Sequence, residues 1–177
     1  MALRDRTAQR MSLERFTEMY PRLFRLAAAG AAGGIRRHGL LTASEAASRA
    51  GVPLSDKPRR EALPVTLPDG TTVIITDNLP LHFQKLGPVL DDDLSPVHWM
   101  RMLNDRVFFW PDRKLGEGNL KARRKIGYAS EWQVYDTRRL LEAIWDRTEI
   151  APINTGSTIH TPARRGLSTF AAINDLD

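Results

Sequence analysis

Residues 65–75 read Val-Thr-Leu-Pro-Asp-Gly-Thr-Thr-Val-Ile-Ile, and they carry the clearest structural signal in the chain. Apolar and β-branched residues flank Pro68-Asp69-Gly70, a tripeptide with the chemistry of a tight turn. The pattern predicts a β-hairpin with strands at 65–67 and 71–75. The rest of the chain shows no internal repeat and no low-complexity tract, so we expect a mixed α+β fold around this hairpin.

Segments with helical periodicity precede the hairpin. Ser12 is a candidate N-cap for a helix that Pro21 bends or ends. Gly39 and Gly51 are candidate ends for two further short helices. The expected elements on this side are a helix from Ser12, a short strand at 23–26, helices at 27–38 and 44–51, and a loop at 52–62.

After the hairpin, Ser95-Pro96 combines an N-cap with a proline at the first helical position, which predicts a helix start. The remaining expected elements are a compact apolar strand at 107–110, a basic loop or short helix at 112–127, a strand at 131–135, a helix at 137–145 and a polar turn at 152–158. We therefore expect one α+β domain over residues 1–177, frayed at 1–11, with small mixed or antiparallel sheets and flanking helices.

Composition excludes several classes of protein. The chain has no cysteine, which excludes disulfide frameworks, thiolate zinc sites and cysteine nucleophiles. Its apolar runs are too short to span a membrane, and its charged first residues do not resemble a signal peptide. The four histidines lack the spacing of metal ligands, so we expect no metal site. These features indicate a globular protein of the cytoplasm.

Charge is distributed unevenly along the chain. The 26 basic and 21 acidic residues give a net charge of +5, and 21 of the basic residues are arginine. Residues 1–60 carry +7 and residues 113–147 carry +4, whereas residues 61–112 carry −5. Two basic blocks favour a partner that bears phosphate. The alternative is that a GC-rich genome replaces lysine by arginine.

Three short motifs occur in a suggestive order. The first is Leu-Phe-Arg-Leu at 23–26, followed by Ile-Arg-Arg-His-Gly-Leu at 35–40. The second is Arg-Val-Phe-Phe-Trp-Pro-Asp at 106–112, and the third is Glu-Trp-Gln-Val-Tyr-Asp-Thr at 131–137. Together they resemble the motifs of the ADP-ribosyltransferase superfamily. The chain also resembles an uncharacterised bacterial family with RVFFW and PINxGST signatures.

The resemblance implies a role for each motif residue, with NAD as the substrate. Glu131 corresponds to the catalytic glutamate, whose charge stabilises the positive charge that develops on the ribose. Arg25 is expected to contact the ADP-ribose half, the backbone of Leu26 to hold the carboxamide, and Phe108 to stack on the nicotinamide ring. His38 belongs to the first motif and is a further candidate contact to NAD.

Two residues depart from the superfamily pattern, and each candidate has a structural alternative. Phe108 replaces a tyrosine, and Ala27 replaces a serine. Arg25 can equally lie at an exposed sheet edge, Phe108 in the core and Glu131 at an exposed strand start. For His38 the alternative is a side chain that caps the carbonyl groups at a helix end.

The turn at 152–158 and two groups of basic residues are candidate phosphate contacts. Backbone N–H groups near Asn154, Ser157 and Thr158 can bind phosphate or ribose, or the segment can be a turn held by its own hydrogen bonds. The basic candidates are Arg123, Arg124, Lys125, Arg164 and Arg165.

Two functional hypotheses follow. The first is an NAD-dependent ADP-ribosyltransferase-like enzyme, toxin-like, acting on nucleic acid and opposed by a neutralising partner protein. The second is a non-catalytic module that binds nucleotide or nucleic acid on the same fold. The first hypothesis predicts that Arg25, Phe108 and Glu131 line one cleft.

Overall fold

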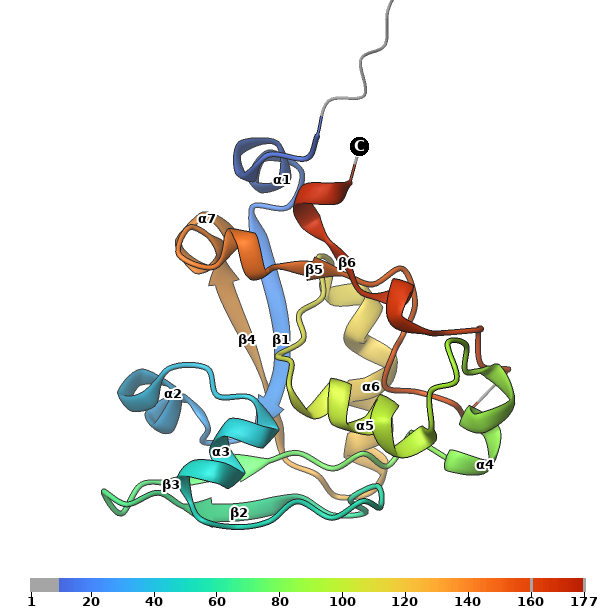
Figure 1. The fold of residues 1–177 in the computed structure, drawn as a ribbon. Helices are drawn as coiled ribbons and strands as arrows, with labels where there is room; N and C mark the ends of the chain where they lie inside the picture. The colour runs from blue at the N-terminus through green and yellow to red at the C-terminus, as the bar shows by residue number, and fades with distance from the viewer. Residues whose placement is uncertain (1–9, 160, 177) are drawn as a thin grey trace, which may run out of the picture.

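The strand pair β1 (Arg22–Ala28) and β4 (Ser130–Asp136) runs through the middle of the molecule (Figure 1). The strands are antiparallel, and Arg25 lies opposite Gln133 in their register. This computed structural model describes residues 10–159 and 161–176. Within those residues the strands form three two-stranded antiparallel sheets, so the expectation of an α+β fold with small antiparallel sheets is confirmed.

The remaining elements surround this strand pair. The described helices are α1 (Leu13–Met19), α2 (Ala32–His38), α3 (Ala43–Arg49), α4 (Phe83–Leu86), α5 (Pro96–Asn104), α6 (Arg113–Lys125) and α7 (Thr137–Leu141). The other strands are β2 (Leu63–Thr66) with β3 (Thr72–Ile75), and β5 (Glu149–Ile150) with β6 (Ala171–Ala172). Short 3-10 turns lie at Gly87–Val89, Trp145–Arg147, Leu167–Thr169 and Ile173–Asp175. No helix in the described ranges has both the length and the apolar character of a membrane span.

The hairpin predicted at 65–75 is confirmed as β2 and β3. Its turn closes through the Leu67 N–H, which donates to the Thr71 C=O at 2.8 Å. The Asp69 carboxylate accepts from the Thr71 N–H at 3.0 Å, and Gly70 adopts a φ of +83°. Because that backbone conformation favours glycine, the turn chemistry correctly located the hairpin.

Side-chain caps explain where several helices begin. The Ser12 hydroxyl accepts from the Arg15 N–H at 3.2 Å, and the Ser95 hydroxyl accepts from the His98 N–H at 3.2 Å. Both helix starts predicted from these serines are therefore confirmed. Residues 1–9 of the segment expected to be frayed lie outside the described residues, but the Met11 N–H donates to the Leu176 C=O at 2.8 Å.

Three hydrophobic clusters form the core. One lies under α5 and α4, a second joins α1 to α7 and the C-terminal segment, and a third lies between α3 and the hairpin. Their buried members are Leu81, Leu86, Trp99, Met100 and Leu103; Phe16, Leu23, Leu141 and Ile173; and Ala46, Ala47, Val65 and Ile75. Leu23 of β1 belongs to the second cluster, which ties the central strand pair to the upper part of Figure 1.

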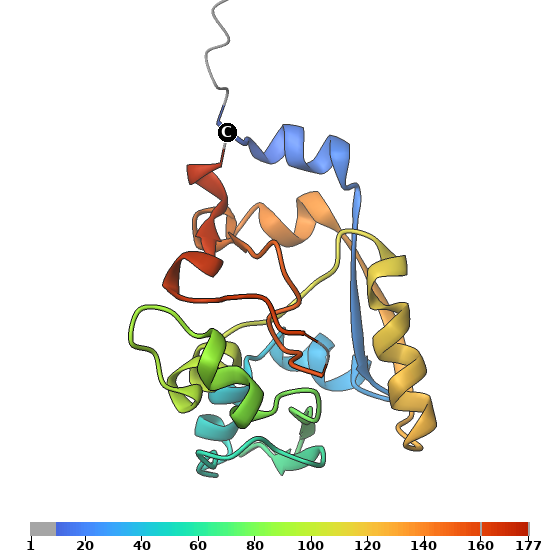
Figure 2. The same cartoon turned by 90° about the vertical axis from the view of Figure 1, so that its right-hand side faces the viewer.

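Two predictions between 107 and 127 are corrected by the structure. The expected strand at 107–110 is reduced to a single bridge, in which Trp110 pairs with Phe24 of β1. The segment 112–127, expected to be a loop or short helix, contains α6, the 13-residue helix that begins at the Asp112 cap. Figure 2 shows α6 along one side of β1, while the chain before Trp110 runs on the other side.

Gly116 allows α6 to lie close to the strand pair. A Cβ atom at this position would overlap the Trp132 ring and lie 3.1 Å from the Trp110 ring. These two indoles pack edge to face, with centroids 5.9 Å apart. Gly118, two residues further along α6, has open space around the equivalent position.

We predict opposite effects for alanine at these two glycines. Gly116→Ala forces the indoles apart and lowers the free energy of unfolding by about 1–3 kcal/mol. Gly118→Ala is the matched control, and it raises the free energy of unfolding by up to about 1 kcal/mol because glycine is a poor helix former. Denaturant titration followed by circular dichroism measures both values. A Gly116→Ala variant as stable as Gly118→Ala would contradict the described packing.

Candidate functional site

The β1–β4 register brings two of the predicted site residues onto one face. Ala27 lies opposite Glu131 and Arg25 opposite Gln133, so all four side chains project to the same side of the strand pair. Tyr135, two residues beyond Gln133, projects to this side as well. α6 covers the other side, where Gly116 meets Trp132.

A chain of hydrogen bonds connects Arg25 to Glu131 through Gln133. The Arg25 Nη1 donates to the Gln133 Oε1 at 3.0 Å, and the Gln133 Nε2 donates to the Glu131 Oε1 at 3.3 Å. The Tyr135 hydroxyl donates to the same Gln133 Oε1 at 2.9 Å. The second carboxylate oxygen of Glu131 accepts from the Gly30 N–H at 3.3 Å. Glu131 is therefore held at both oxygens and directed toward the Arg25 side of the face.

Burial changes the protonation chemistry of this face. It lowers the pKa of the Arg25 guanidinium and raises the pKa of the Tyr135 phenol. The Arg25 charge opposes the rise in the Tyr135 pKa, whereas the Glu131 charge adds to it. The raised pKa keeps the Tyr135 phenol protonated at neutral pH, so its O–H donates to Gln133 there.

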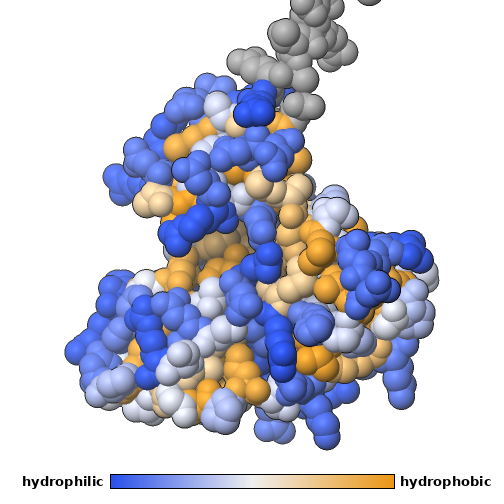
Figure 3. Space-filling model, in the orientation of Figure 1, coloured by the Kyte–Doolittle hydropathy of each residue, from blue (hydrophilic) through white to orange (hydrophobic). Residues whose placement is uncertain are grey.

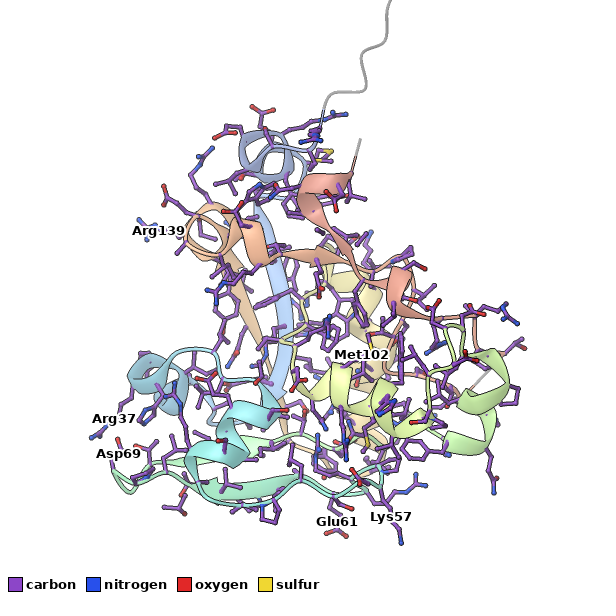
Figure 4. The ribbon with its side chains drawn as sticks, in the orientation of Figure 1. Arg37, Lys57, Glu61, Asp69, Met102 and Arg139 are labelled. Atoms are coloured by element: carbon purple, nitrogen blue, oxygen red, sulfur yellow. The ribbon has the colours of Figure 1, made fainter. Side chains whose placement is uncertain are left out.

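The molecular surface is hollowed over the strand pair. Figure 3 shows this hollow between the part of the molecule that contains α1 and α7 and the part that contains α2, α3 and the hairpin. Figure 4 places Arg139 on α7 at one side of this gap and Arg37 on α2 at the other. β1 and β4 cross the space between these two sides in Figure 1, and the residues Arg25, Glu131 and Gln133 are each partly exposed.

The backbone of Leu26 is directed to the free edge of β1. Ala29 donates its N–H to the Ala129 C=O at 3.0 Å, which makes the odd-numbered residues of β1 the hydrogen-bonded partners of β4. The even-numbered residues therefore point their N–H and C=O groups the other way, and Phe24 exchanges two bonds with Trp110, at 2.9 and 2.8 Å. The bridge is limited to Phe24 and Trp110. Within the described chain, the N–H and C=O of Leu26 therefore have no strand partner.

The residue of the second motif that packs on the site face is Phe109 rather than the predicted Phe108. The Phe109 ring packs perpendicular to the Tyr135 ring, with centroids 5.4 Å apart. Phe108 is 40% exposed, and its ring lies 6.4 Å from that of Phe170. Of the three residues expected to line one cleft, Arg25 and Glu131 share a face of the strand pair, and Phe108 lies elsewhere. The reason is that adjacent residues in extended chain point to opposite sides.

His38 lies away from the strand pair, at the end of α2. Its Nε2 is 3.2 Å from the Asp69 carboxylate in the hairpin turn, and Arg37 is 2.7 Å from the same carboxylate oxygen. Figure 4 shows Arg37 and Asp69 facing one another across this contact. His38 joins α2 to the hairpin, and the structure supports neither its predicted contact to NAD nor a carbonyl cap.

The turn at 154–158 is anchored by hydrogen bonds, chiefly to the segment at 80–82. The Thr158 side chain is 0% exposed, and its hydroxyl accepts from the His82 N–H at 2.7 Å. Ser157 donates its N–H to the Asn154 C=O at 3.5 Å. Thr158 therefore has a role in the fold, whereas the predicted binding roles of the exposed Asn154 and the partly exposed Ser157 stay predictions.

Two of the predicted phosphate-binding arginines are structural. Arg165 is 2% exposed, and its guanidinium donates to the carbonyls of Thr155 and Ala163, both at 3.0 Å. Arg123 forms an ion pair of 3.1 Å with the buried carboxylate of Asp77. Neither guanidinium is free for an external phosphate.

Three other predicted phosphate contacts remain on the surface. Arg164 is exposed and pairs with Asp91. Arg124 and Lys125 are exposed in the last turn of α6. Only the last two lie on an element with further basic residues, so the predicted basic surface is confined to α6.

One family profile matches residues 21–177 and so includes every residue of this face. The chain belongs to DUF7002. DUF7002 is described as a family of unknown function, so membership assigns no activity to the Arg25–Glu131 face. No curated protein and no solved structure matches the chain. The resemblance of this DUF7002 protein to ADP-ribosyltransferases, and to the RVFFW and PINxGST signatures, stays a prediction from its motifs.

Gln133 and Tyr135 were missed by the sequence reasoning, although a signal for them exists. Glu131, Gln133 and Tyr135 occupy alternate positions of one strand, whereas Trp132 and Val134 lie between them. A strand with one entirely polar face next to a suspected catalytic glutamate indicates a network on that face.

We predict that the pKa of Tyr135 reports the charges of this face. The pKa is raised above its ordinary value of 10.0, so the phenol stays protonated and stability is retained below about pH 10, then falls as the pH passes the raised value. Glu131→Gln lowers the pKa and Arg25→Met raises it, because each removes one charge. Phenolate absorbance, taken as the difference from Tyr135→Phe in each background, measures the shifts. Shifts of the same sign in both variants would contradict the network.

We predict a large difference between two adjacent arginines. Arg165→Met leaves the Ala163 carbonyl without its donor, reduces the donors to the Thr155 carbonyl to the Trp99 indole N–H, and lowers the free energy of unfolding by about 2–4 kcal/mol. Arg164→Met removes an exposed ion pair and costs no more than about 1 kcal/mol. Thermal denaturation compares the two variants. Equal destabilisation would show that the burial of Arg165 is not what holds this turn.

Proposed function

We propose that this protein is an NAD-dependent ADP-ribosyltransferase-like enzyme. The observation that carries the proposal is the hydrogen-bonded connection from Arg25 through Gln133 to Glu131 on one face of β1 and β4. The motif resemblance predicted that Arg25 and Glu131 act together although they are far apart in sequence. Their placement on one face supports that prediction.

The proposed reaction breaks the bond between the ribose C1′ and the nicotinamide nitrogen. The bonding electrons leave with nicotinamide, and positive charge develops on the ribose. A carboxylate next to that carbon stabilises the charge, which is the role proposed for Glu131. An acceptor nucleophile then forms the new bond to C1′ and loses a proton. The Gly30 N–H and the Gln133 amide hold the carboxylate in place, so little reorganisation is needed when charge develops.

Two further features of the face fit parts of NAD. The Leu26 N–H and C=O at the free edge of β1 form an adjacent donor and acceptor, the pattern that a carboxamide requires. Arg25 has five N–H donors, of which one bonds to Gln133, so it retains capacity for a diphosphate. Phe109 supplies an aromatic ring on the same face, beside the ring of Tyr135.

A non-catalytic nucleotide-binding module is the second candidate. Both carboxylate oxygens of Glu131 accept hydrogen bonds from the protein, and this arrangement also suits a carboxylate that only braces the loop at Gly30. Ala27, opposite Glu131, supplies no hydroxyl. Such a module binds NAD without breaking it.

We predict that the purified protein releases nicotinamide from NAD and that Glu131→Gln slows the release by about 10²–10³-fold, because the substitution removes charge stabilisation and keeps the shape. Chromatography of nicotinamide measures the rate, and calorimetry measures NAD binding. The matched control is Glu61→Gln, an exposed glutamate far from the strand pair in Figure 4.

Each result distinguishes the candidates. Release that is equal in Glu131→Gln and wild type would remove Glu131 from the reaction. Binding of NAD without release in wild type would favour the non-catalytic module. Absence of both binding and release would contradict both candidates.

A further inference from the structure

Three of the five lysines in the chain lie along the outer crest of α6. Lys114, Lys121 and Lys125 are separated by seven and four residues, which places them within about 40° of one another around the helix. All three are exposed, whereas Gly116 and Leu120 are buried on the inner face. At 1.5 Å per residue, the row is about 16 Å long. We call these three side chains the lysine crest.

The lysine crest has no ion-pair partner among the described residues, unlike Arg113 and Arg123 of the same helix. Arg113 is 3.4 Å from Glu117 and lies over the Trp132 ring, and Arg123 pairs with Asp77. None of the described acidic side chains forms an ion pair with the lysine crest. The crest is therefore a row of uncompensated positive charge.

Helix stability explains only part of the lysine crest, because Lys125 alone lies in the last turn of α6, where the helix dipole favours a cation. Lys114 lies in the first turn of α6, where the helix dipole disfavours a cation, and that turn contains no acidic residue. Genome composition also fails as an explanation, because the chain otherwise uses arginine for 21 of its 26 basic residues. A selected function for three lysines in one row accounts for both facts.

Gly118 lies on the crest between Lys114 and Lys121, with open space around it. Glycine weakens an exposed helix by about 1 kcal/mol relative to alanine, and no packing contact requires it here. Its absence of a side chain lets an elongated partner approach the helix backbone between the lysines. The crest thus combines spaced charge with an unobstructed surface.

We propose that the lysine crest binds the phosphodiester backbone of nucleic acid. A straight row of lysines matches the regular spacing of phosphates along a polynucleotide. Such contacts give affinity that does not depend on the base sequence. An anionic membrane fits less well, because a membrane-bound helix places apolar residues at the centre of its contact face. Here the exposed apolar residues Leu115 (65%) and Ile126 (54%) flank the crest on one side only.

The proposed surface is separate from the candidate NAD site. α6 packs on one side of the strand pair (Figure 2), the side of Trp132. By the strand register, Arg25 and Glu131 project from the opposite side. Binding at the crest therefore leaves the Arg25–Glu131 face open. The proposal stands whether or not the protein acts on NAD.

A triple variant, Lys114→Gln/Lys121→Gln/Lys125→Gln, tests the proposal by fluorescence anisotropy. The probes are a labelled single-stranded RNA, a single-stranded DNA and a DNA duplex, titrated over a series of salt concentrations. We expect at least tenfold weaker binding and a salt slope reduced by about 2–3, since each lysine–phosphate contact contributes about one unit. The matched control, Lys57→Gln/Arg60→Gln/Lys85→Gln, removes the same charge from exposed residues elsewhere and changes affinity less than twofold.

Three results would overturn the proposal. Equal loss of affinity in both triple variants would assign binding to net charge rather than to the crest. Absence of binding to every nucleic-acid probe in wild type would remove the partner. Binding to vesicles with anionic lipid but to none of the nucleic acids would identify a membrane surface instead. Circular dichroism confirms that both variants are folded.

Discussion

The antiparallel pairing of β1 with β4 joins segments that are more than one hundred residues apart in sequence. One face of this pair carries the Arg25–Glu131 network, and the other receives α6 through Gly116. Leu23 at its upper end enters the cluster with Phe16 and Leu141. Loss of the pairing would separate the candidate site, the basic helix and one hydrophobic cluster at once. Because such distant segments must meet before any of these contacts form, the pairing also sets a high entropic cost for folding.

Local chemistry made part of the structure predictable. The Pro68-Asp69-Gly70 turn and the Ser95 cap act within four residues of themselves, so their elements could be identified from the sequence alone. α6 was predicted less well, because its two glycines and many charges resemble a loop and its stability depends on packing against Trp110 and Trp132. The prediction of a strand at 107–110 was wrong for a similar reason, since only Trp110 of that segment pairs with another strand.

The charged residues of the candidate site could be predicted from the sequence, but the hydrogen bonds that connect them could not. Arg25 and Glu131 were identified through motifs, whereas the register that puts Gln133 between them depends on a long-range pairing. Some arginines are buried in the fold and others lie on the surface, and a count of charges does not distinguish the two groups. Arg165 and Arg123 satisfy buried carbonyls and a buried carboxylate, so part of the arginine excess stabilises the fold and does not form a surface for anions.

Gln133 separates a cation from an anion that would otherwise neutralise one another. Its amide oxygen faces Arg25 and its amide nitrogen faces Glu131, which fixes the orientation of the side chain. The face therefore has a positive end and a negative end along the direction of β4, like a small permanent dipole set into the sheet. A molecule with opposite charges at its two ends is favoured on this face in one direction and disfavoured in the other.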